Sequence, residues 1–443
     1  MDTSKLSRRD FLQRAAFVTM GASAATALAA CQPAATVSDD AAAGDAAPMS
    51  EPVELSLWTF GSFFTDFYEA IFPAYKEIAP DVTIEVQEIP GGQLFDNLIA
   101  SFAAGTGAPD IADIEQGSMS RFFKGEIGLI DLTDLIAPYV DDYVMARTDP
   151  YSYLGHIYGI DHCLCPVVLY YRHDLYAEAG IEMPVATWQD FAEAAQGFEG
   201  TEAAAMSLAD RSWGDYWMLL TQRGTGGIFN ADGEVIIDQP EAIDTLSFYV
   251  DQLTSGTFAV TPSGPASYAA LTEGTIAGRI GADWFGGFIK LNVGDPGHGL
   301  WMAAPLPAWE EGGARTTAHG GTGYTITRQS EAPDAAWAFI EFALFDEDNK
   351  YIEYGVNNLI PPILSMLDDE RYLAPDPWYS DQSIGALYRD LGGEIPRHNR
   401  HPFFSEAVNL LSSAVTEAVA GDKIPAQALE DMAQELRETI DKG

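Results

Sequence analysis

The sequence predicts an α/β protein whose globular part is large enough for two lobes. Strand patterns alternate with helix patterns from residue 53 onward, which is typical of parallel α/β sheets. Residues 53–443 form a segment that is too long to fold around one ordinary hydrophobic core, so we expect two lobes. No stretch in this range is apolar enough to predict a membrane-spanning helix.

The first thirty residues predict an export leader. RRDFL at residues 8–12 is followed by residues 15–30, which carry no charged side chain. The paired arginines resemble a twin-arginine export signal, and LAAC at residues 28–31 resembles a lipobox. We therefore expect residues 1–30 to be removed. Cys31 would then carry a lipid that anchors the exported protein at the extracytoplasmic face of a membrane, in the periplasm or at the cell surface.

Composition separates a tether from the globular part and limits the partners. Residues 31–52 are rich in Ala, Asp and Pro and poor in large apolar side chains, so we expect a flexible tether. The whole chain has 66 acidic and 23 basic residues and a net charge of −43. Such a chain repels nucleic acid and anionic lipid headgroups, so we expect neither as a partner and expect the lipid to be the only membrane contact.

The start of the globular part predicts an open parallel sheet. Alternation and helical spacing favour strands at 53–58, 82–86 and 110–114, and helices at 63–79 and 93–104. This order requires parallel pairing through right-handed crossovers. Ligands bind such sheets beyond the carboxyl ends of the strands, here at Trp58 to Gly61 and at Glu115 to Gly117.

Two cysteines, Cys163 and Cys165, lie in the segment HCLC. The geometry of a regular strand disfavours a disulfide between residues two positions apart, so we expect two buried, unbonded side chains. The sequence offers no second Cys/His pair at metal-ligand spacing, and we expect no metal.

Six successive segments carry a resemblance to a known family. They are LWTFGSFF, FAAGTGAPDIADI, HIYGIDHCLCPVVLYYRHDLYAEAGIEMPVATWQDF, GGIFNADGEVIIDQPEAIDTLSFYVDQL, LTEGTIAGRIGADW and GGTGYTITRQSEAPDAAWAFIEFAL. In this order they resemble the extracellular solute-binding proteins of the maltose-binding type, which deliver sugars to ABC importers. HCLC departs from the pattern, because family members usually carry small or aliphatic residues there.

The resemblance implies a periplasmic-binding-protein fold with a ligand cleft between two lobes. The chain would cross between the lobes three times, near 160–165, 317–321 and 357–362. Lobe one would comprise 53–160 plus 320–358, and lobe two 163–316 plus 363–443. The resemblance further implies hinge closure on the ligand, delivery to permease subunits, a monomer and no cofactor.

The segment GRIGADWFGG, residues 278–287, is the first candidate binding site. The resemblance implies that its Trp284 stacks on a sugar ring. Asp283 would accept hydrogen bonds from neighbouring hydroxyls. The alternative is that Trp284 only fills the core beside a turn that needs glycine.

Further candidate ligand-binding residues stand at strand ends and crossings. They are Trp58, Glu115, Gln116, Asp161, Trp213, Gly320, Gly321, Tyr324 and Asn357. Trp58 also fits a buried strand position, Glu115 and Gln116 also fit a turn, and the two glycines also fit a hinge. The basic segment RHNRH at 397–401 is expected mainly to balance nearby acidic charge rather than to face the ligand.

The motifs present in the sequence, and those it lacks, distinguish between the possible functions. The sequence lacks GxSxG, HExxH and P-loop motifs, so we expect no enzyme, although the many carboxylates leave a secreted glycosidase as an alternative. A binding protein for a polyol, an amine or another cation is a second alternative, because Trp and acidic side chains also enclose cations. An anionic ligand is disfavoured, because the candidate residues include no Arg or Lys. A structural surface lipoprotein would neither close nor bind a ligand.

Overall fold

The computed structural model describes residues 52–225 and 227–442. The leader, Cys31 and all but the last residue of the expected tether lie outside the described residues. Residues 51–443 form one compact unit whose longer strands are divided between two sheets. No helix among the described residues is long and apolar enough to cross a membrane.

The first sheet has five strands in the order β2-β1-β3-β12-β6. The strands are β1 (Val53–Thr59), β2 (Val82–Glu88), β3 (Ile111–Glu115), β6 (Ile160–Asp161) and β12 (Thr322–Ile326). The strand β1 pairs in parallel with β2 and β3, and β12 pairs antiparallel to β3 and β6. The predicted parallel start of the sheet is therefore confirmed.

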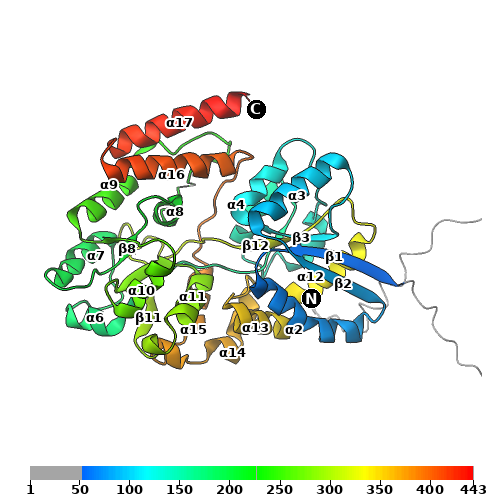
Figure 1. The fold of residues 1–443 in the computed structure, drawn as a ribbon, viewed down its shortest axis with the longest axis horizontal. Coiled ribbons are helices and arrows are strands. Elements are labelled where there is room, and N and C mark those ends of the chain that lie inside the picture. The colour runs from blue at the N-terminus through cyan, green and yellow to red at the C-terminus, as the bar shows by residue number, and fades with distance from the viewer. Residues whose placement is uncertain (1–51, 226, 443) are drawn as a thin grey trace, which may run out of the picture. The chain divides into compact units, whose positions relative to one another are not determined.

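Helices cover the first sheet (Figure 1). They include α2 (Ser62–Ile78), α3 (Gly91–Ala104), α12 (Pro333–Phe345) and α13 (Glu347–Asn357). Apolar residues of α2 recur at helical spacing and are buried: Phe64, Phe67, Tyr68, Ile71 and Tyr75. Ala336, Phe339, Ile340, Ala343 and Leu344 of α12 extend the same core. The predicted helices end within two residues of the observed ones.

The second sheet has three antiparallel strands in the order β10-β7-β11. They are β7 (Val168–Arg172), β10 (Gly278–Gly281) and β11 (Trp301–Ala304). The longer helices in this part of the chain are α8 (Trp213–Gln222), α9 (Pro240–Ser255), α10 (Pro265–Glu273), α11 (Asp283–Val293), α15 (Ile384–Gly392), α16 (Phe404–Ala420) and α17 (Pro425–Lys442). In Figure 1, α16 and α17 run side by side, in agreement with their contacts.

Short elements complete the described chain. They are α4 (Gln116–Met119), α5 (Thr133–Ile136), α6 (His173–Glu178), α7 (Trp188–Ala194), α14 (Glu370–Leu373), β4 (Ser152–Tyr153), β5 (His156–Ile157), β8 (Ser207–Leu208) and β9 (Ala259–Val260). Eight 3-10 turns lie at Ser120–Phe123, Ala137–Tyr139, Met145–Arg147, Asp149–Tyr151, Ala195–Phe198, Asp295–Gly297, Leu364–Asp368 and Pro377–Tyr379.

The glycines of GRIGADWFGG serve close packing. The segment is the strand β10 followed by the start of α11. A Cβ on Gly286 would lie 2.6 Å from the Tyr170 hydroxyl oxygen, and one on Gly287 would lie 2.8 Å from the Cβ of Asn358. These glycines allow α11 to approach β7 and the end of α13.

Three chain segments that the sequence predicts as crossings lie side by side. The N–H of His162 donates to Thr322 O at 2.8 Å, and that of Leu164 donates to Ile360 O at 2.8 Å. His319 N–H in turn donates to Cys165 O at 3.2 Å. Backbone hydrogen bonds therefore hold the three crossing segments together where the chain passes between the two sheets.

The structure corrects the prediction for the cysteines, because Cys163 and Cys165 form a disulfide. The prediction assumed a regular strand. Instead the chain has left its strand pairing at 163–165, and Cys165 has a φ of 52°, which brings the two Cα atoms to 5.5 Å. Both sulfur atoms and a carboxylate oxygen of Asp283 lie within 4.8 Å of one another. Sulfurs bonded to each other are not free thiolates for a metal.

Candidate functional site

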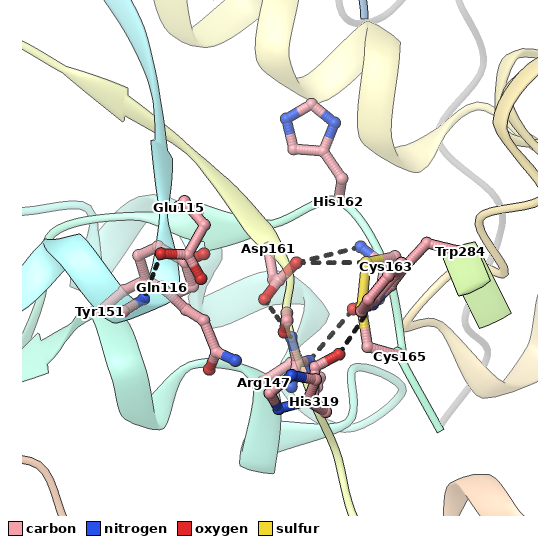
Figure 2. A network of polar contacts seen from close by, with 12 residues as sticks. Glu115, Gln116, Arg147, Tyr151, Asp161, His162, Cys163, Cys165, Trp284 and His319 are labelled. Atoms are coloured by element: carbon pink, nitrogen blue, oxygen red, sulfur yellow. Dashed lines mark hydrogen bonds and ion pairs between the residues drawn. A yellow bond between two sulfur atoms is a disulfide. The ribbon is translucent and has the colours of Figure 1, made fainter. Parts of the chain in front are cut away.

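A buried ion pair anchors the first two crossings. Arg147 donates from Nη2 to Asp161 Oδ2 at 2.5 Å and to Gly320 O at 2.7 Å, and its Nε donates to Cys163 O at 3.1 Å. Figure 2 shows this network with the disulfide beside it. Both charged side chains are fully buried, so Asp161 is committed to Arg147 and positions the crossings.

Gly320 and Gly321 permit this close approach. Gly321 has a φ of 121°, and a Cβ there would collide with Arg147 and lie 2.5 Å from Asp161 Oδ2. A Cβ on Gly320 would lie 2.7 Å from Nε1 of Trp284. Both positions therefore need glycine for space as well as for backbone conformation.

Asp283 holds the start of α11 against the third crossing. Its Oδ1 accepts from Trp284 N–H at 2.8 Å, and its Oδ2 accepts from Ile360 N–H at 3.0 Å. Asn358 Nδ2 also donates to its backbone oxygen at 2.6 Å. Burial raises the pKa of Asp283 to about 7, although the two backbone hydrogen bonds act in the opposite direction. Both carboxylate oxygens thus have backbone partners, and the group positions Trp284.

Two half-buried tryptophans flank His319. Trp284 donates from Nε1 to His319 O at 2.9 Å, and its ring centroid lies 6.2 Å from that of His319. Trp213, at the start of α8, lies 5.7 Å from His319 on the same measure. Burial lowers the pKa of His319 to about 4, so this imidazole is neutral at pH 7. The arrangement offers flat apolar faces beside neutral polar groups, which suits sugar rings.

Glu115 and Gln116 lie on the other side of the site. Glu115 Oε2 accepts from Gly117 N–H at 2.8 Å and caps the short helix α4. The N–H of Gln116 donates to Gly321 O at 3.0 Å, while its side-chain Oε1 accepts from Arg400 at 2.8 Å. The residues at the end of β3 thus form hydrogen bonds both with the second crossing, at Gly321, and with Arg400.

Two predicted residues belong to strands of the first sheet. Tyr324 is 1% exposed and stacks on the buried His162 ring at 3.7 Å, within the core beside α2. Trp58 is the penultimate residue of β1, pairs with Gln87 and Ala112, and packs half-buried against the core under α3.

Asn357 ends α13 at the third crossing. Its side-chain oxygen and nitrogen are both buried and have no hydrogen-bond partner among residues 52–225 and 227–442. A buried amide without partners is costly, so this side chain is suited to receive a ligand hydroxyl.

The sequence analysis missed several residues of the site. Trp217 lies 5.9 Å from both Trp213 and His398 by ring centroids. Arg400 places its guanidinium 3.9 Å from the Phe404 ring centroid. The basic segment 397–401 was a usable signal, but the expectation that it balances surface acids holds only for Arg397, which pairs with Asp149.

Next to this group lies a cavity of about 950 Å³. It is lined by four segments and one further residue: Phe123 to Gly125, Ser152 to Gly155, Ala231 to Gly233, Arg400 to Phe403, and Ile440. This volume is in the range of pockets that hold small ligands.

Comparison with known proteins places the chain in a family. Residues 61–350 match the model of the bacterial extracellular solute-binding proteins. The chain belongs to this family. Members of this family are exported solute-binding proteins. The family predicted from the six sequence segments is therefore confirmed.

Several relatives are sugar-binding proteins. The chain is 29% identical over 403 residues to the arabinooligosaccharide-binding protein of Bacillus subtilis (strain 168), covering 88% of this chain and 93% of that protein. Among solved structures it is similar to the sugar-binding protein MalE of Xanthomonas citri, with a TM-score of 0.77 and 20% identity over 88% of this chain and 98% of the other. It is likewise similar to a binding protein from B. animalis subsp. lactis solved with β-1,6-galactobiose, with a TM-score of 0.71 and 18% identity over 89% of this chain and 98% of the other. The two-lobed periplasmic-binding-protein fold is thereby confirmed.

Proposed function

We propose that this protein captures a sugar or oligosaccharide at the tryptophan-flanked site and delivers it chemically unchanged to the permease of an ABC importer. The arrangement of Trp213 and Trp284 around His319, at the hydrogen-bonded crossings, supports the proposal most directly. The sugar-binding relatives support the same ligand class. Arabino- and galacto-oligosaccharides are accordingly the first ligands to test.

The proposal includes a hinge between two lobes. Lobe one comprises 53–160 plus 320–358, lobe two comprises 163–316 plus 363–443, and the three crossings form the hinge. The ligand binds between them and stabilises closure, because only a ligand that contacts both lobes favours the closed state.

The test is a ligand panel measured by thermal shift and calorimetry. It includes mono- and oligosaccharides, polyols and amines, applied to the wild type and to Trp213→Ala and Trp284→Ala. We expect a sugar to bind and each substitution to weaken binding about tenfold or more, because a stacking surface is lost. Trp337→Ala is the matched control, since Trp337 is half-buried on α12, away from the site.

The outcomes separate the alternatives. Binding of a polyol or an amine in place of every sugar would identify a different ligand class. Recovery of cleaved oligosaccharide from the complex would favour a glycosidase. A sugar that binds both tryptophan variants with wild-type affinity would remove these residues from the site.

We also propose that the protein works as a lipid-anchored monomer outside the cytoplasm. The twin-arginine motif and the lipobox-like LAAC support this. Mass spectrometry of the mature N-terminal peptide is expected to find a diacylated Cys31, and Cys31→Ser is expected to release the protein from membranes. Light scattering of the released form is expected to give the monomer mass. An unmodified Cys31 in membrane-bound protein would contradict the anchor.

A further inference from the structure

Arg400 is a cation of the site that forms no ion pair with any described residue. Its Nη2 donates to the neutral amide oxygen of Gln116 at 2.8 Å. Its Nε and Nη1 are buried and have no hydrogen-bond partner among the described residues. A guanidinium has five N–H donors, so at least three of them lack a protein acceptor here.

Three aspartates of the site region are already committed to other arginines, and Asp149 among them acts electrostatically on Arg400. Asp161 pairs with Arg147, Asp149 pairs with Arg397, and Asp215 pairs with Arg279. None of these three carboxylates is therefore free to pair with Arg400.

Two further acids, each within two residues of a side chain that Arg400 contacts, are occupied as well. Glu406 pairs with Lys124 at 2.5 Å, and Glu115 accepts from the backbone at Gly117. Within residues 52–225 and 227–442, no carboxylate lies within ion-pair distance of Arg400. In a chain with 66 acidic and 23 basic residues, such a cation is unexpected unless something else supplies the negative charge.

The guanidinium is held in one orientation. Its Cζ atom lies 3.9 Å from the Phe404 ring centroid and 5.5 Å from the Trp217 ring centroid, while Gln116 fixes one nitrogen. Burial lowers the pKa of Arg400 to about 10, with Glu115 opposing that shift, so the group keeps its charge at pH 7. Gln116 accepts only one of the two hydrogens on Nη2. The other Nη2 hydrogen, together with a hydrogen on Nε or on Nη1, forms an edge of the guanidinium with two unoccupied donors. Such an edge matches the two oxygens of a carboxylate.

The surroundings add one donor, Trp217 Nε1, and one imidazole nitrogen, His398 Nδ1, that donates or accepts according to its tautomer. Trp217 Nε1 can only donate, and it is buried without a partner among the described residues. His398 Nδ1 is likewise buried and unpartnered within those residues, while the Nε2 of His398 lies 3.3 Å from Thr317 Oγ1. The cavity beside them is lined by Lys124 and Arg400 against the single acid Asp232. A ligand that supplies acceptors and negative charge fits this set better than one that supplies only hydroxyls.

We propose that the site is specific for an acidic sugar, with the carboxylate of a uronic acid residue bound to the open edge of Arg400. The proposal rests on the proposed function and narrows its substrate class. Neighbouring sugar rings would stack on the tryptophans, and the carboxylate would give Arg400 its missing counter-charge.

The test compares sugars that differ only at C6. Calorimetry is carried out with cellobiose against cellobiouronic acid, and with α-1,4-galactobiose against digalacturonic acid. We expect the acidic member of a pair to bind the wild type about tenfold tighter or more, as for a hydrogen-bonded charge pair. Arg400→Gln should weaken binding of that acidic sugar about 100-fold and leave any binding of its neutral partner within about threefold.

Arg389→Gln is the matched control, because Arg389 lies on α15 and pairs with Asp368 and Asp390, so its removal frees no carboxylate that acts on Arg400. It should leave both affinities unchanged. Circular dichroism of each variant checks the fold, and the wild-type comparison stands alone if Arg400→Gln does not fold. Neutral sugars that bind the wild type as tightly as their acidic partners would overturn this inference and leave the sugar-binding function standing. If no sugar of either kind binds, the proposed function itself fails.

Discussion

Three histidines show how single-residue surroundings set the charge in this protein. Burial and nearby arginines together lower the pKa of His398 to about 3 and that of His319 to about 4, although Asp215 opposes the shift at His319. Burial also acts to lower the pKa of His162, but hydrogen bonds with Asp113 and Glu353, at 3.2 and 3.0 Å, raise it to about 9. The histidines of the binding site are therefore neutral, while the one in the core is an imidazolium held by two carboxylates.

His162 should make stability depend on pH. Its folded-state pKa of about 9 lies above the unfolded value of 6.5, so its contribution is complete below about pH 6.5 and is lost as the pH rises through about 9. The shift corresponds to about 3 kcal/mol of unfolding free energy. Urea unfolding between pH 6 and 9.5 should show this decline in the wild type and a flatter profile in His162→Gln. The exposed His156, paired with Asp131, gives the control His156→Gln, whose profile should follow the wild type. A decline of the same size in His162→Gln would assign the pH dependence to other groups.

Gly321 should tolerate no side chain. In Gly321→Ala the methyl group meets the buried pair of Arg147 and Asp161, so we expect a loss of about 3 kcal/mol in unfolding free energy, as for a disrupted buried ion pair. Gly312→Ala is the control, because Gly312 also has a positive φ but has open space around its Cβ position. It should lose only about 1 kcal/mol. Equal losses in urea unfolding would show that the backbone conformation, and not the contact, matters at residue 321.

At the scale of elements, the order of strands and helices follows the hydrophobic periodicity closely. The helix α2 and the strands β1 to β3 were predictable because their apolar spacing is local. The segment 163–165 was not, because a left-handed residue at Cys165 interrupts the strand and no local pattern announces it. The start of α11 at Asp283 was also missed, since the glycine-rich sequence around it indicates a turn.

The disulfide should contribute little to global stability. It closes a loop of only three residues, so replacing both Cys163 and Cys165 by Ser should cost no more than about 2 kcal/mol. Urea unfolding should show that reductant lowers wild-type stability by a similar amount and leaves the double variant unchanged. Sensitivity of the double variant to reductant would contradict this account. A folded double variant that has lost sugar binding would place the disulfide in the site.

For the whole molecule, contacts between residues assigned to different lobes define the arrangement that a ligand would stabilise. Ser120 and Ser405 approach to 2.9 Å between their hydroxyl oxygens, Lys124 pairs with Glu406, and Arg400 contacts Gln116. These contacts lie on one side of the hydrogen-bonded crossings. Opening of the proposed hinge would break them together.

A disulfide across this contact should trap the ligand. In the double variant Ser120→Cys with Ser405→Cys, oxidation in the presence of a bound sugar should slow its release about tenfold or more, because opening is blocked. Reduction should restore the wild-type rate, measured by stopped-flow tryptophan fluorescence. The oxidised and reduced wild type control for the native disulfide. If the ligand leaves the cross-linked protein at the wild-type rate, release does not require the lobes to separate.

The sequence alone determined the family, the α/β architecture and the segments that meet at the crossings, because these depend on local periodicity and on motifs in a fixed order. It also pointed to Trp213, Trp284 and the paired glycines as special positions. Only the tertiary structure decided which charges are satisfied. Asp161 and Asp283 are occupied by Arg147 and by backbone N–H groups, whereas Arg400 has no carboxylate partner in the part of the chain that the structure describes. Charge pairing depends on residues that are far apart in the chain, and no local pattern of the sequence encodes it.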